Sequence, residues 1–262
     1  MRLHRFYIKE DLLVGKDVVV SDPGLIHQIR DVFRLVDAGR EVLLFNGSGG
    51  EFLCGIVSLD KKQLVLHVIE EREKPSNRKD KEGTELWLLA ALIKKDNFEW
   101  VIQKATELGV SHIVPIISER SEKKDLNMER ANKILIEASE QSGRVTLPTL
   151  NTPEYLDVVL ERLSDQDEEK MNFLAFDPSG KQFKISDNTA SQKVGLLIGP
   201  EGGWTEKELE MFHTKNIPIY NLGSQILRAE TEFNRVNRLQ GYRSVRILTP
   251  MELIYGDPEE KI

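Results

Sequence analysis

The chain contains very little cysteine, and its apolar residues never form a long run. Cys54 is the only cysteine among 262 residues, so no disulfide can form within the chain and a reducing compartment is favoured. The longest apolar run, residues 86–93, is far shorter than the roughly 20 residues that a membrane helix needs, and the N-terminus lacks the apolar segment of a secretory signal. We therefore expect a cytoplasmic protein without membrane contact, in which Cys54 is a buried structural thiol.

Two common signatures of nucleotide-binding loops are missing as well. The glycine-rich segments match neither the dinucleotide fingerprint G-x-G-x-x-G nor the P-loop, and we predict no metal site. The net charge of −7 argues by itself against a nucleic-acid partner. However, acidic residues concentrate in 164–170 and 256–261, whereas five arginines lie between 228 and 246. These arginines form either a local basic face or a solvated helix and tail.

Residues 1–73 have the pattern of a small β-barrel. Asparagine and glycine in 46–50 predict a turn between two antiparallel strands, because both residues tolerate positive φ. Pro23 begins a predicted helix over 23–35, with Ile26, Ile29, Val32 and Phe33 on one face. Residues 74–83 have the polar, charged composition of a linker. The strands expected in the barrel are 18–22, 40–47, 51–60 and 63–71.

Residues 84–262 alternate between strand and helix, which predicts an α/β domain with a parallel sheet. Strand 85–92, a helix and strand 112–117 form a β-α-β unit. Asp96 and Glu99 have the spacing of a capping box at the start of that helix, and Gly109 is placed to end it. The later elements expected are helices 128–142, 153–163 and 205–213, and strands 171–176, 193–198 and 217–222.

Two glycine-rich loops follow strands of this domain directly. Residues 198–204 read IGPEGGW, and residues 222–231 read LGSQILRAET. Ligands of open α/β sheets bind at the carboxyl ends of strands, and glycines allow the backbone to approach a ligand closely. Taken singly, the first loop is equally consistent with a structural turn, and the second with a surface ion pair. Together they predict a binding site.

The amino-acid sequence of these loops resembles that of a known family. IGPEGGWTEKELE followed by LGSQILRAET is similar to the closing signature of the bacterial 16S rRNA (uracil-N3)-methyltransferase family, RsmE, in the SPOUT superfamily. The segments HQIRDVFRL, REVLLFNGSGGEF, IKKDNFEWVIQKATELGVSHIVPIISERS and EASEQSGRVTLP resemble the family's earlier motifs, in the same order. The resemblance implies a PUA-like RNA-binding barrel (1–73), a linker (74–83) and a trefoil-knotted methyltransferase domain (84–262). It also implies a homodimer that uses S-adenosylmethionine.

The resemblance and the chemistry of the reaction together suggest a set of site residues. Uracil N3 is mostly protonated at neutral pH, so its methylation requires a proton acceptor and a cation to stabilise the anion. We hypothesise that Arg228 orients and stabilises the uracil, and that Glu201 or Glu230 accepts the proton or positions the groups that do. The residues expected to hold S-adenosylmethionine are Leu197, Ile198, Gly199, Gly203, Leu222, Gly223, Ile226 and Leu227.

Contact with 16S rRNA, in the assembled small ribosomal subunit, is expected from scattered basic residues. Each of them is also consistent with a solvated surface charge. His27 either contacts RNA or caps its own helix, and Gln141, Ser142 and Arg144 either line the site or end a helix. Two rival functions remain open: a non-catalytic RNA-binding or ribosome-assembly protein, and a phosphate-binding α/β enzyme acting on a small nucleotide. The expected RNA contacts are Arg30, Arg34, Arg120, Lys123, Lys124 and Arg144.

Overall fold

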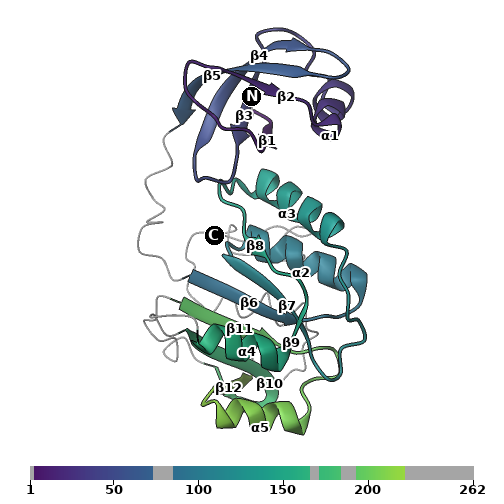
Figure 1. Ribbon diagram of the computed structural model, residues 1–262, viewed down its shortest axis with the longest axis vertical. Coiled ribbons are helices and arrows are strands. Elements are labelled where there is room, and N and C mark those ends of the chain that lie inside the picture. Colours follow the sequence, from purple (N-terminus) through teal and green to yellow (C-terminus); the bar gives the residue numbers. More distant parts are fainter. Residues whose placement is uncertain (1–2, 73–84, 166–170, 184–192, 222–262) are drawn as a thin grey trace, which may run out of the picture.

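The computed structural model describes residues 3–72, 85–165, 171–183 and 193–221. These residues form two sheets, each with its own helices and hydrophobic core, and the two units lie end to end along the long axis of the molecule (Figure 1). No helix within these ranges is both long and apolar enough to cross a membrane.

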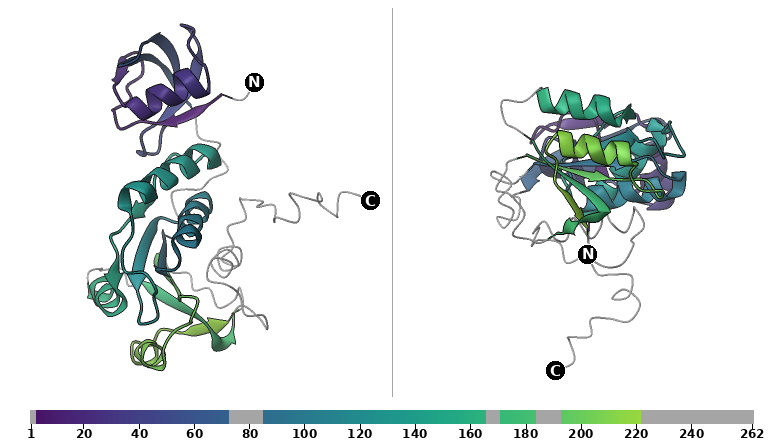
Figure 2. Two further views of the ribbon diagram at one scale, coloured as in Figure 1. Left: turned by 90° about the vertical axis from the view of Figure 1, so that its right-hand side faces the viewer. Right: turned by 90° about the horizontal axis from the view of Figure 1, so that it is seen from below.

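The N-terminal unit is a curled five-stranded sheet in the order β1-β3-β4-β5-β2 (Figure 2). The four strands expected from the sequence are confirmed, and residues 46–50 connect β3 to its antiparallel neighbour β4 as predicted. β1, which pairs in parallel with β3, was not predicted, because three residues are too few to show a period. The strands are β1 (Arg5–Tyr7), β2 (Asp17–Val20), β3 (Glu41–Phe45), β4 (Glu51–Leu59) and β5 (Leu64–Arg72).

The helix predicted in this unit is present but changes type along its length. Helix α1 (Pro23–His27) continues into a π-helix, η1 (Gln28–Val32), in which the Phe33 N–H donates to the Gln28 carbonyl five residues back. The wider turn keeps Ile29 fully buried and turns Val32 outward, leaving it 60% exposed. The placement of Val32 on the buried face was therefore wrong.

Cys54 lies on β4 inside the core of the N-terminal unit. Its side chain is fully buried, and this burial raises the pKa of the thiol to about 12. A thiol with so high a pKa stays protonated and unreactive at neutral pH, which confirms the structural interpretation.

The C-terminal unit is a parallel sheet in the order β12-β10-β11-β6-β7-β8, with β9 also paired to β7. Helices α2 and α3 cover one face, and α4 and α5 cover the other (Figure 2), so successive strand residues contribute to opposite cores. The strands are β6 (Glu85–Ala91), β7 (His112–Ile117), β8 (Thr149–Leu150), β9 (Glu154–Tyr155), β10 (Asn172–Gln182), β11 (Lys193–Ile198) and β12 (Ile219–Asn221); the helices are α2 (Lys95–Glu107), α3 (Met128–Ser142), α4 (Leu156–Asp165) and α5 (Glu206–Thr214).

The ends of these helices correct two predictions. α2 begins two residues earlier than the proposed capping box, with Lys94 at the N-cap; Asp96 lies in its first turn, and Glu99 instead pairs with Arg130 on α3. α4 begins at Leu156, because residues 154–155 pair with β7 as β9. The end of α3 at Gly143, which is left-handed with φ of 78°, is confirmed.

Candidate functional site

The first glycine-rich loop leaves β11 at the carboxyl edge of the parallel sheet and leads into α5. We call residues 199–205 the glycine loop. Gly203 has φ of 69°, a conformation that disfavours any residue with a Cβ. A Cβ added at Gly199 would lie 3.1 Å from the Trp204 ring. Glycine is therefore favoured by the backbone conformation at Gly203 and by close contact with the Trp204 ring at Gly199.

Trp204 anchors the glycine loop to the core. Its side chain is 4% exposed, and its Nε1–H donates to the Phe176 carbonyl at 2.9 Å. Its ring packs edge to face against Phe212, with 5.1 Å between the ring centroids. An indole that is both buried and hydrogen-bonded strongly restrains its backbone. The loop is therefore held against β10 at Phe176, where the pairing of β10 with β11 ends.

The start of α5 ties the glycine loop to the loop that follows β7. Thr205 and Glu208 form the capping box predicted from the sequence. Glu208 is buried; its Oε2 accepts from the Thr205 N–H at 2.8 Å, and its Oε1 accepts from the Glu119 N–H at 2.9 Å. The Thr205 hydroxyl also lies 3.0 Å from a Glu119 carboxylate oxygen. One carboxylate thus fixes two loops that are 89 residues apart in sequence.

Arg120 makes a second connection between the same two loops. One of its guanidinium nitrogens, Nη1, donates to the Gly202 carbonyl at 2.8 Å and to the Trp204 carbonyl at 3.3 Å. Arg120 was expected from the sequence to contact RNA, and its contact with the glycine loop was not predicted. Only the order of strands in the sheet, which places β6 between β7 and β11, brings these loops to one edge.

The expected site residues on β11 and the glycine loop occupy different environments. Leu197 and Ile198 are buried and belong to the cores on opposite faces of the sheet. Glu201 is exposed, and its Oε1 lies 3.5 Å from the backbone nitrogen of Lys94, where β6 leads into α2. Glu201 therefore stands at the carboxyl edge between the ends of β11 and β6. The other expected residues of this site, Leu222, Gly223, Ile226, Leu227, Arg228 and Glu230, lie outside the described residues.

Comparison with known proteins decides the family. A model of the RNA methyltransferase domain matches residues 80–233. Ribosomal RNA small subunit methyltransferase E of Rickettsia conorii is 32% identical over 239 residues, which cover 88% of this chain and 92% of that protein. The chain belongs to the ribosomal RNA small subunit methyltransferase E family. The resemblance found in the sequence is thus confirmed.

Other members of the family extend the likeness over nearly the whole chain. The Bacillus subtilis enzyme of the same name is 31% identical and covers 79% of this chain and 82% of its own length. The crystal structure of the Neisseria gonorrhoeae enzyme, bound to S-adenosylmethionine, is 26% identical, covers 97% of this chain and 98% of its own, and has a TM-score of 0.79. A Legionella pneumophila structure in complex with the same cofactor is 29% identical over 92% of this chain and 98% of its own, with a TM-score of 0.77.

The basic residues expected to contact RNA differ in their surroundings: some are exposed, and others pair with neighbouring protein groups. Arg34, Lys123 and Lys124 are exposed. Arg30 instead pairs with Asp31, whose other partner is His27 on the same helical segment. Hydrogen bonds from Arg30 and His27 hold the pKa of the Asp31 carboxyl well below its usual range. His27 thus has an acidic partner within its own segment.

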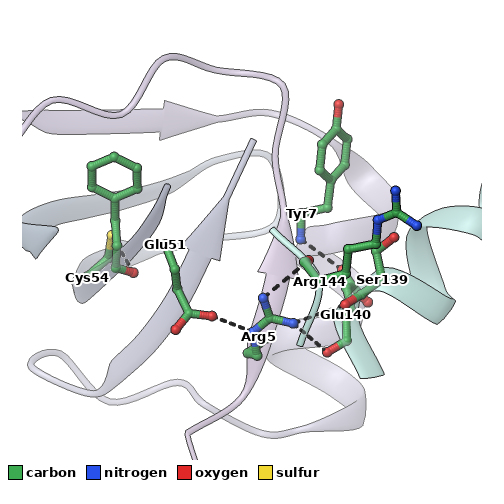
Figure 3. Close-up of polar contacts among 8 residues, drawn as sticks. Arg5, Tyr7, Glu51, Cys54, Ser139, Glu140 and Arg144 are labelled. Carbon is green, nitrogen blue, oxygen red and sulfur yellow. Dashed lines mark hydrogen bonds and ion pairs between the residues drawn. The ribbon is translucent and has the colours of Figure 1, made fainter. Parts of the chain in front are cut away.

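Arg144 belongs to a joint between the two units. Its Nη1 donates to the Thr106 carbonyl at the end of α2, and its own carbonyl accepts from Arg5 of β1 (Figure 3). Arg5 also donates to the carbonyls of Ser139 and Glu140, in the last turn of α3, at 3.0 and 2.9 Å. We call Arg5, Glu51, Ser139, Glu140 and Arg144 the joint.

Two carboxylates complete the joint. Glu51 of β4 lies 2.5 Å from Nε of Arg5, and Oε1 of Glu140 accepts from the Tyr7 N–H at 2.9 Å. Glu140 is buried, and the burial raises the pKa of its carboxyl to about 7. No sequence pattern pointed to this cluster, since its members come from β1, β4 and the end of α3.

Proposed function

We propose that this chain transfers a methyl group from S-adenosylmethionine to N3 of a uridine in 16S rRNA. The broader statement, that the chain is an S-adenosylmethionine-dependent ribosomal RNA methyltransferase, follows from its family. The observation that supports the proposal most directly is the glycine loop, which stands anchored at the carboxyl edge of the sheet in a chain of this family.

The described half of the proposed cofactor site fits S-adenosylmethionine. At Gly203, the nearest atom to an added Cβ is Oδ2 of Asp177, 3.9 Å away, so the left-handed backbone there is not crowded by neighbouring side chains. Backbone groups of Gly199 to Gly203 suit the hydrogen bonds that hold an adenine ring. We propose that this loop forms one wall of the site and that Leu222, Gly223, Ile226 and Leu227 form the other. When bound, S-adenosylmethionine supplies the methyl group.

The chain's own residues perform two tasks in the proposed reaction. A carboxylate, Glu201 or Glu230, removes the N3 proton or orients the group that removes it. The exposed position of Glu201 at the carboxyl edge is compatible with this role. Arg228 binds the negative charge that then spreads over O2 and O4, because a guanidinium remains charged at every relevant pH.

The remaining assignments are part of the same proposal. Residues 1–73 act as a PUA-like RNA-binding barrel, 74–83 as a linker and 84–262 as a trefoil-knotted SPOUT methyltransferase domain that dimerises in the cytoplasm. Exposed Arg34, Lys123 and Lys124 are the best placed of the expected RNA contacts, and the substrate is the assembled small ribosomal subunit.

Methyl transfer to ribosomal subunits tests the proposal. Small subunits from a strain lacking the gene are incubated with labelled S-adenosylmethionine and the protein, with naked 16S rRNA in parallel, and the product is identified by nucleoside mass spectrometry. We expect 3-methyluridine, and its loss in Arg228→Ala with cofactor binding retained. Label on another nucleotide would refute the N3 assignment; binding to the subunit without any transfer would instead support a ribosome-assembly protein.

A further inference from the structure

We propose that Arg120 is a positioning residue of the cofactor site: it holds the glycine loop in the conformation that binds S-adenosylmethionine. This inference rests on the proposed function and differs from the RNA contact expected from the sequence. It begins from the two carbonyls that Arg120 binds, Gly202 and Trp204, which lie immediately before and after Gly203.

The two carbonyls that Arg120 binds flank the residue that sets the conformation of the loop. Gly203 is the left-handed residue of the loop, with φ of 69°, and its N–H donates to the Pro200 carbonyl at 2.9 Å, which closes a turn and marks the reversal of the chain. A single nitrogen of Arg120 binds the carbonyls on both sides of that reversal, at 2.8 and 3.3 Å. Hydrogen bonds from a charged donor are about twice as strong as neutral ones. Arg120 therefore acts on the residue whose conformation sets the shape of the loop.

The stem of Arg120 gives the second argument. A Cβ added at Gly202 would lie 3.4 Å from Cδ and 3.6 Å from Cβ of Arg120, so the aliphatic stem packs against the loop backbone. The preceding residue, Glu119, is fixed to buried Glu208 through its N–H. Arg120 is thus directed at the loop by its own backbone, as a residue with a positioning role must be.

The exposure of Arg120 gives the third argument, because it separates the loop's shape from the stability of the fold. Trp204 and Glu208 are buried and anchor the end of the loop that leads into α5, whereas Arg120 is exposed and contacts only backbone carbonyls on either side of Gly203. Without Arg120 the loop remains attached but populates other conformations, and the apparent affinity for a ligand falls with the fraction of competent loop.

The experiment compares two neighbouring cations. Isothermal titration gives the dissociation constant for S-adenosylmethionine, and steady-state kinetics give separate KM values for cofactor and ribosomal subunit. We expect Arg120→Ala to raise the cofactor Kd and KM about tenfold, the scale of one strong hydrogen bond, with the KM for the subunit unchanged. Arg120→Lys restores part of the affinity. Lys123→Ala, three residues along, gives the opposite result: an unchanged cofactor Kd and a raised KM for the subunit.

Three outcomes separate this inference from its alternatives. Wild-type cofactor affinity in Arg120→Ala would overturn it. A raised subunit KM at wild-type cofactor Kd would overturn it in favour of an RNA contact. Absence of cofactor binding in the wild-type protein would overturn the proposed function, and this inference with it. If Arg120→Ala does not fold, Arg120→Lys and Arg120→Gln provide the same comparison.

Discussion

Two arginines join distant segments of this protein through backbone carbonyls, and their settings differ. The side chain of Arg5 is 9% exposed, pairs with the Glu51 carboxylate and binds three carbonyls at the joint. Arg120 is exposed and binds two carbonyls of the glycine loop. A desolvated charge is costly to leave unpaired, whereas an exposed one is rehydrated easily. The same residue type thus stabilises the fold at Arg5 and the shape of a loop at Arg120.

Removal of Arg5 is the strongest test of this contrast. Arg5→Ala leaves the Glu51 carboxylate and the carbonyls of the joint without their donor. Loss of one partner of a fully buried pair costs about 3–5 kcal/mol, and the Glu51 side chain is 22% exposed, so the lower end of that range applies. We expect a loss of that size in the free energy of unfolding, measured with denaturant. Arg40→Ala, which removes an exposed partner of Asp37, serves as the control and should cost less than about 1 kcal/mol. Equal losses in both variants would remove the distinction.

Glu140 makes the joint sensitive to pH. Its folded-state pKa of about 7 lies above the usual 4.5. Between these values the unfolded chain loses the proton while the folded chain keeps it, so rising pH destabilises the fold by about 1.4 kcal/mol per pH unit. Above pH 7 both states are ionised, and the full cost remains, at most about 3 kcal/mol.

Glu140→Gln isolates this term, because glutamine does not titrate and its oxygen can still accept from Tyr7. Denaturant unfolding should show the variant gaining stability relative to wild type as pH rises from 4.5 to 8. Exposed Glu129→Gln, at the other end of the same helix, should show no such trend. A parallel pH dependence for Glu140→Gln and wild type would rule out the raised pKa.

The joint and the glycine loop also differ in how far the sequence predicts them. The glycines, the capping box of Thr205 and the flanking strand and helix were read from local patterns, since each depends on neighbours within a few residues. The contacts of Arg5, Glu140 and Arg120 depend on which elements lie next to one another in the fold. No local sequence pattern predicts that arrangement. The misplaced capping box at Asp96 shows the opposite limit: the spacing is that of a capping box, but Asp96 lies within the first turn of the helix and not at its N-cap.

Gly203→Ala tests the glycine loop itself, with a smaller expected effect. Its φ of 69° costs an alanine about 1 kcal/mol relative to glycine, and no crowding adds to the cost. The thermal midpoint should fall by a few degrees. Gly202→Ala is the matched neighbour: its φ is not positive and the added Cβ makes an ordinary contact with Arg120, so its midpoint should stay close to wild type. Equal shifts would mean that backbone conformation does not set the cost.

The smallest expected effect on stability belongs to Arg120→Ala. Because the side chain is exposed, we expect a change within about 0.5 kcal/mol in the absence of cofactor. Cofactor should then expose the difference, since a ligand stabilises the fold in proportion to RT ln(1 + [L]/Kd). At a concentration of 100 times the wild-type Kd the wild-type protein gains about 2.7 kcal/mol, and a variant with tenfold weaker binding gains about 1.4 kcal/mol. Arg5→Ala should retain the same deficit with and without S-adenosylmethionine, provided its folded form binds the cofactor normally. If the stability loss depends on cofactor for Arg120→Ala and not for Arg5→Ala, then Arg120 stabilises the cofactor-binding conformation of the loop, whereas Arg5 stabilises the fold itself.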